Sequence, residues 1–216
     1  MSDAVYAQAI GICAALLLLS AVLLVWRRAQ VTALPLLSLQ GLALASLVAV
    51  IAIKEGSPEL MGVAVLVLLF KAIAFPVALA RSGRGEYGGA PLINTATSLI
   101  AMAALTALAY AVSTPLSVLG TGPTIQAVPV GIALVLFGFL LLVTGRHAIA
   151  QLIGFLVIDN GTATVAFLSS GGVPIIVELG IFLDVLLVIL ILYVLTGRIR
   201  DEYGDADLDD LTELHD

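Results

Sequence analysis

The sequence is poor in charged residues and in cysteine, and each shortage excludes a class of protein. Charged residues make up 11% of the 216 positions and hydrophobic residues 61%, whereas soluble domains have roughly a quarter and about half. Nine Lys and Arg stand against fifteen Asp and Glu, so the chain lacks the basic surface that nucleic-acid binding needs. One cysteine, Cys13, cannot form an intramolecular disulfide or a multi-cysteine metal site. We therefore expect neither a soluble protein, nor a nucleic-acid partner, nor redox chemistry in this chain.

The chain is instead rich in long apolar stretches. A helix crosses the hydrocarbon core of a membrane with about 20 mostly apolar residues. Seven stretches meet this requirement: 4–26, 31–53, 59–80, 92–113, 125–144, 148–169 and 174–196. Turn residues separate several of them, as at Gly56-Ser57-Pro58. The sequence predicts an all-α, polytopic membrane protein, with a seven-helix membrane domain over residues 1–200.

The basic residues predict how the protein lies in the membrane. If the loops alternate between the two sides, all seven arginines fall on one side and only Lys54 on the other. The basic side faces the cytoplasm, so we expect the N-terminus outside and the C-terminus in the cytoplasm. The first stretch has no basic segment before it and no small-residue cleavage site, which indicates a retained anchor.

Residues 201–216 form a predicted acidic cytoplasmic tail. They contain eight acidic residues and no Lys or Arg. Leu208, Leu211 and Leu214 follow helical spacing within it. The tail is either a solvated segment or a docking segment whose leucines pack on a peripheral partner.

Four ionisable residues lie inside the predicted spans: Lys71 in the third, Asp159 in the sixth, and Glu178 and Asp184 in the seventh. Each charge at mid-membrane costs about 2.5–3.5 kcal/mol, so we expect these groups to be paired, hydrated or neutral. Glu178 lies nearer the outer end of its span, and the other three lie near mid-span. Pro76 removes a helical hydrogen bond just after Lys71 and predicts a kink in the third span.

These residues indicate a proton or ion path across the middle of the membrane, because intramembrane ionisable groups usually serve function. The alternative is a set of pairs that only fix helix register. Gln40 and Asn160 are supporting polar residues, either on the path or in an interhelical hydrogen bond. His147, at the cytoplasmic mouth of the sixth span, is a candidate proton-exchanging group or an ordinary interfacial histidine.

No catalytic or cofactor motif is found in its required context. Residues 83–88 match G-x-G-x-x-G, but they follow a membrane helix rather than a strand, so a dinucleotide site is not predicted. No P-loop, Ser/His/Asp set or metal-ligand spacing is present. We therefore expect no catalytic centre, metal site or cofactor in this chain.

Several segments together resemble the component E membrane subunit of hydrogenase-4 and formate hydrogenlyase-type complexes. They are residues 146–155, 159–161, 172–174, 177–180 and 208–214, with Gln40, Lys71, Pro76 and Asp184. Residues 125–196 also resemble the three-helix K subunit of respiratory complex I and the C subunit of multisubunit sodium/proton antiporters. Asp184 lies near the complex I carboxylate of the third helix. In the second helix the corresponding position is Leu156, and the carboxylate lies at Asp159.

The resemblance implies a non-catalytic subunit of a complex-I-like, energy-converting hydrogenase in the inner membrane of a bacterium or archaeon. Such a subunit would contribute to proton or ion translocation and would link antiporter-like membrane subunits. Soluble hydrogenase-type partner subunits would hold the nickel–iron and iron–sulfur centres.

Four other interpretations are open. The chain could belong to a cation/proton antiporter without redox partners, or to a complex-I-like NADH dehydrogenase. A purely structural subunit would use the charges as helix locks. A retinal photoreceptor has seven spans and a buried lysine, but it carries that lysine in its last helix, whereas Lys71 lies in the third span.

Overall fold

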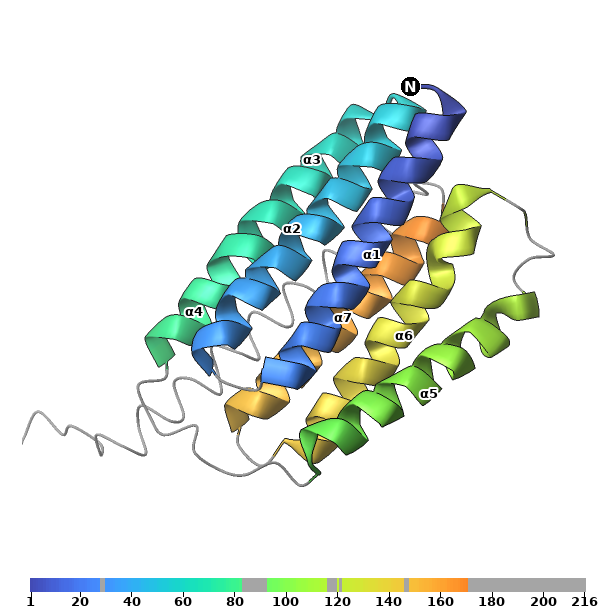
Figure 1. The fold of residues 1–216 in the computed structure, drawn as a ribbon. Helices are drawn as coiled ribbons and strands as arrows, with labels where there is room; N and C mark the ends of the chain where they lie inside the picture. The colour runs from blue at the N-terminus through green and yellow to red at the C-terminus, as the bar shows by residue number, and fades with distance from the viewer. Residues whose placement is uncertain (28–29, 83–92, 116–119, 121, 146–147, 171–216) are drawn as a thin grey trace, which may run out of the picture. The chain divides into compact units, whose positions relative to one another are not determined.

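The computed structural model describes residues 1–27, 30–82, 93–115, 120, 122–145 and 148–170 (Figure 1). This part of the chain is helical and contains no strand. Its elements are α1 (Asp3–Arg27), α2 (Gln30–Glu55), α3 (Pro58–Val67), η1 (Leu68–Ala74), α4 (Phe75–Ser82), α5 (Thr95–Ser113), α6 (Pro123–Thr144) and α7 (Ala148–Ser170).

Six of the predicted spans are confirmed as helices that are long and apolar enough to cross a membrane. The third span consists of α3, η1 and α4 in direct succession, and the other five are single helices. The seventh predicted span, 174–196, and the tail, 201–216, lie outside the described residues. The predicted orientation stays a prediction, because it depends on arginines whose side chains also lie outside the described part.

The turn between α2 and α3 follows from three consecutive residues. Gly56 has φ +67°, a backbone conformation that glycine adopts without steric cost. The Ser57 hydroxyl accepts a hydrogen bond from the Leu60 N–H at 3.2 Å, and Pro58 occupies the first helical turn. The chain therefore reverses at this point, and α3 packs against α2.

An ion pair shows that α1 and α2 are antiparallel. Lys54 Nζ, at the end of α2, lies 2.5 Å from Asp3 Oδ1, at the start of α1. The pair is exposed, and surface pairs of this kind contribute little stability. The pair does establish the relative direction of the two helices, because it joins the first turn of α1 to the last turn of α2.

The helices α6 and α7 share the most extensive contact in the described part, and glycines bring their backbones together. A Cβ added to Gly138 of α6 would lie 2.6 Å from the Ile158 nitrogen of α7 and 2.7 Å from the Gly154 carbonyl oxygen. Gly131 and Gly161 form a similar close approach on the same two helices. Such small-residue contacts are how helices pack in a membrane, where the hydrophobic effect does not drive them together.

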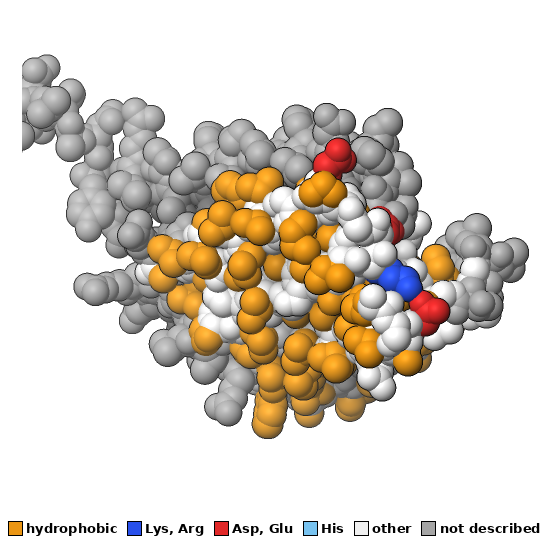
Figure 2. Space-filling model, turned by 90° about the horizontal axis from the view of Figure 1, so that it is seen from above, with side chains coloured by type: hydrophobic (Ala, Val, Ile, Leu, Met, Phe, Trp, Pro, Cys, Tyr) orange, Lys and Arg blue, Asp and Glu red, His pale blue; other side chains and the backbone are white. Residues whose placement is uncertain are grey.

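The surface of the described part is largely apolar. Figure 2 shows hydrophobic side chains over most of the described surface on one face, with the few charged side chains toward one edge. On α5, Ile100 is 71% exposed and Val112 is 60% exposed. Apolar surface on this scale is unusual for a soluble monomer and agrees with helices that contact lipid.

We predict that Gly138→Ala destabilises the protein by about 1–3 kcal/mol, because the added methyl group meets the backbone of α7, which cannot rotate away. Gly62→Ala is the matched control, since a Cβ on this α3 glycine meets nothing within 4 Å. Thermal unfolding of the detergent-purified chain, followed by circular dichroism, measures both variants. Equal midpoints for Gly138→Ala and Gly62→Ala would contradict the close α6–α7 contact.

Candidate functional site

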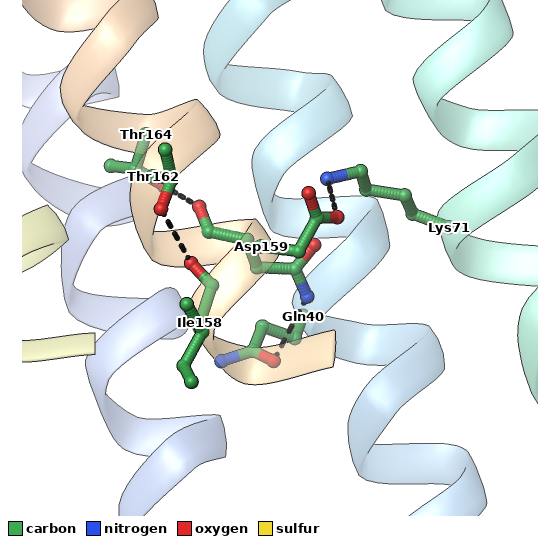
Figure 3. A network of polar contacts seen from close by, with 7 residues as sticks. Gln40, Lys71, Ile158, Asp159, Thr162 and Thr164 are labelled. Carbon is green, nitrogen blue, oxygen red and sulfur yellow. Dashed lines mark hydrogen bonds and ion pairs between the residues drawn. The ribbon is translucent and has the colours of Figure 1, made fainter. Parts of the chain in front are cut away.

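The structure brings together two residues that the sequence indicated, Lys71 of η1 and Asp159 of α7. Lys71 Nζ lies 2.5 Å from Asp159 Oδ2, and the two residues are 88 positions apart in the chain. Figure 3 shows the lysine side chain extending from its helix to the carboxylate on α7. Asp159 is the central residue of α7, and Lys71 lies near the middle of the segment formed by α3, η1 and α4. The pair therefore lies at mid-span depth.

The helix around Lys71 is not an α-helix. Residues Leu68–Ala74 form a π-helix, in which the Phe75 N–H bonds to the carbonyl of Phe70, five residues earlier. Pro76 follows immediately and has no N–H to donate, and its ring crowds the preceding turn. The α-helix is therefore interrupted beside Pro76 by a widened π-helical segment centred on Lys71, which the sequence did not predict. The predicted kink stays a prediction.

Gly41 allows α2 to approach the backbone of Lys71. A Cβ at Gly41 would lie 2.5 Å from the Lys71 carbonyl carbon and 2.6 Å from the Ala72 nitrogen. Only glycine fits at this distance without displacing one of the helices. The sequence analysis did not identify this residue. The available signal was the small residue Ala45 four positions later, a spacing that often marks helix contacts in membranes.

The two amide side chains that were predicted as supporting residues bond directly to each other. Asn160 Nδ2 donates to Gln40 Oε1 at 3.0 Å, and both residues are buried. The Thr164 hydroxyl donates a hydrogen bond to the Asn160 carbonyl oxygen at 2.7 Å, one turn earlier in α7. Gln40 is 0% exposed, and its Nε2 has no hydrogen-bond partner within the described part of the chain. The polar residues thus form an interhelical pair and leave one buried donor.

A small hollow adjoins one member of each pair, Lys71 and Asn160. It is about large enough for one water molecule. It is lined by Leu37, Lys71, Phe75, Pro76, Leu156 and Asn160. Leu156 therefore forms an apolar wall of this hollow, and the carboxylate of Asp159 reaches Lys71 from the next turn of α7.

The other predicted site residues are not placed. Glu178, Asp184 and His147 lie outside the described residues. Among the residues that are described, no group of three or more His, Cys, Asp or Glu side chains could hold a metal ion. The site that the structure does define is therefore Lys71, Asp159, Gln40 and Asn160, on η1, α7 and α2.

The two members of the ion pair are unequally enclosed. The Lys71 side chain is 2% exposed, whereas the Asp159 side chain is 15% exposed. Burying a charge is costly unless a partner of opposite charge compensates it. The ammonium is therefore the more deeply buried of the two charges. A close ammonium and carboxylate can also exchange a proton, which no apolar contact can do.

The buried pair gives a prediction for stability. Removing one member of a buried pair costs about 3–5 kcal/mol, and we expect a cost of this order for Asp159→Asn and for Lys71→Met, since each removes the contact and leaves the other charge in place. The double variant Lys71→Met/Asp159→Leu should be more stable than either single variant, because neither charge of the pair is then left without the other.

A double-mutant cycle on the detergent-purified chain, measured by thermal unfolding, gives the coupling between the two sites. Asn94→Ala, an exposed helix cap far from the pair in sequence, serves as a control for general loss of stability. Additive effects of the two substitutions would contradict the direct contact.

Comparisons with known proteins place the chain in a family. No family model and no solved structure matches it. Hydrogenase-4 component E of Escherichia coli K12 is 30% identical over 88 residues, which is 41% of each chain, and that of Shigella flexneri matches to the same extent. The uncharacterized protein Rv0085 of Mycobacterium tuberculosis is 43% identical over 220 residues, which covers 100% of both chains. The chain therefore belongs to the family of the Mycobacterium tuberculosis protein Rv0085.

Proposed function

We propose that this chain is a non-catalytic membrane subunit of a complex-I-like, energy-converting hydrogenase of the hydrogenase-4 type. In this role it contributes to the translocation of protons or other ions through the Lys71–Asp159 pair. The observation that carries the proposal is the pair itself, an ammonium and a carboxylate in contact at mid-span. Similarity to hydrogenase-4 component E over 41% of the chain supports the type of complex.

The pair is suited to passing a proton because its two states have the same net charge and differ only in where the proton lies. With both groups ionised, the pair is neutral overall. After a proton passes from the ammonium to the carboxylate, both groups are neutral. A charge that approaches from a neighbouring subunit would favour one state over the other, so the pair can respond to events elsewhere in a complex.

The proposal assigns the chemistry of electron transfer to other chains. Soluble hydrogenase-type subunits would hold the nickel–iron and iron–sulfur centres, and antiporter-like membrane subunits would adjoin this chain in the cell's inner membrane. The seventh span and the cytoplasmic C-terminus belong to the same proposal, because an odd number of spans places all the loop arginines on one side. Glu178, Asp184 and His147 would extend the path beyond the pair.

The double variant Lys71→Met/Asp159→Leu also distinguishes ion conduction by the pair from a purely structural role. We expect Lys71→Met/Asp159→Leu to assemble into the complex in normal amounts and to abolish or strongly reduce ion translocation coupled to electron transfer. The reason is that two apolar side chains fill the space of the pair but cannot hold or pass a proton. Proton uptake into inverted membrane vesicles, driven by the electron donor of the complex, measures the effect, and subunit content by mass spectrometry measures assembly.

Gly62→Ala serves as the matched control for mutation of the same helical span, and Lys71→Arg tests whether charge alone suffices. Normal translocation in the assembled double variant would reject conduction through this pair and indicate a purely structural role.

The metal content of the purified complex tests separately which type of complex the chain belongs to. Nickel and iron in the purified complex would support the hydrogenase type, whereas their absence from an active complex would indicate a cation/proton antiporter.

A further inference from the structure

The Lys71 ammonium occupies the place where an inorganic cation would bind. A mid-span carboxylate attracts a cation, and oxygen atoms of neighbouring side chains would complete the coordination of a hard ion such as Na⁺. At Asp159 the position facing Oδ2 is taken by Lys71 Nζ. The nearby amide oxygen of Gln40 accepts a hydrogen bond from Asn160, so it too is engaged.

We propose that Lys71 is a built-in cation that makes the site selective for protons and excludes sodium ions. The inference rests on the proposed function, since it names the ion that the pair would handle. Lys71 is covalently attached and deeply buried, so an arriving Na⁺ cannot displace it into water as it would displace another ion. A Na⁺ beside it would bring two positive charges together where the dielectric is low.

A proton faces neither obstacle, because it moves within the existing hydrogen bond. The N–H bond of the ammonium breaks, its electron pair remains on Nζ, and an O–H bond forms on Oδ2. The products are a neutral amine and a neutral carboxylic acid, so no charge is created or lost. The transfer requires no additional space, which suits a pair whose adjoining hollow is about the size of one water molecule.

The same geometry predicts what happens when the ammonium is removed. Lys71 and Asn160 both line the hollow, so truncation of the lysine side chain enlarges a space that already borders an amide group. Asp159 then loses its cationic partner, and Asn160, which lines the same hollow, adjoins the vacated space. We therefore expect Lys71→Ala to create a sodium site from the wild-type residues around it.

Binding of radiolabelled sodium to the purified full-length chain in lipid nanodiscs, at constant pH, tests this inference. We expect no saturable binding to the wild-type chain or to Lys71→Arg, and saturable binding to Lys71→Ala that is at least about tenfold tighter than any wild-type binding. The double variant Lys71→Ala/Asp159→Asn should lose the new binding, because its carboxylate is gone. Circular dichroism of each sample reports whether the variant is folded.

Two results would overturn the inference. One is saturable sodium binding by the wild-type chain that Asp159→Asn removes, and the other is a folded Lys71→Ala variant without sodium binding. If Lys71→Ala does not fold, the comparison of the wild-type chain with Asp159→Asn still decides the question. Because these measurements use the chain alone, they fail independently of the proposed function, whose failure would appear as normal proton uptake by vesicles that contain Lys71→Met/Asp159→Leu.

Discussion

A buried ammonium requires an anion beside it, and the described helices are arranged to provide one. Lys71 is almost completely enclosed, at a depth where an isolated charge would cost about as much as several good packing contacts contribute. The π-helical segment carries this ammonium, Gly41 lets α2 approach the backbone of Lys71, and α7 carries the Asp159 carboxylate. The glycine contacts between α6 and α7 serve the same arrangement, since they set where α7 stands.

Two adjacent residues of α7 attach it to two different helices. Asp159 contacts Lys71 of η1, whereas Asn160 contacts Gln40 of α2, because successive side chains on a helix point about 100° apart. The first contact is charged and can change with a proton transfer. The second joins neutral amides and does not. The hydrogen bond between the two side-chain amides can therefore keep α7 against α2 in either charge state of the ion pair. A change in charge at the ion pair need not loosen the helices.

The sequence allowed the helices to be predicted well, because span length depends on the thickness of the membrane and on little else. The predicted boundaries of α1, α2, α6 and α7 lie within about two residues of the observed ones. The partner of Lys71 was less predictable, because Asp159 and Asp184 lie at similar depth and spacing alone does not show which helices are neighbours. Asp159 is confirmed as a partner of Lys71, and Asp184 lies outside the described residues.

Two features of the site could not be derived from residue types alone. Pro76 predicted a lost hydrogen bond, but the response of the helix, a widened π-turn around Lys71, depends on how the neighbouring helices hold that turn. The role of Gly41 could not be recognised from the sequence, because glycine is common in membrane helices. Its importance arises only from the Lys71 backbone that packs against it. The π-helical segment and the role of Gly41 both depend on contacts between helices that are distant in the sequence, rather than on local helix propensity.

The unequal burial of the ion pair also decides how the site meets its surroundings. The Lys71 side chain is almost fully buried and borders a small hollow that Asn160 also lines, whereas the Asp159 side chain is 15% exposed. Within the described helices, the accessible edge of the pair therefore belongs to the carboxylate and not to the ammonium. Under the proposed function, the carboxylate would therefore be the member of the pair that exchanges protons, and the lysine would be its internal counter-charge.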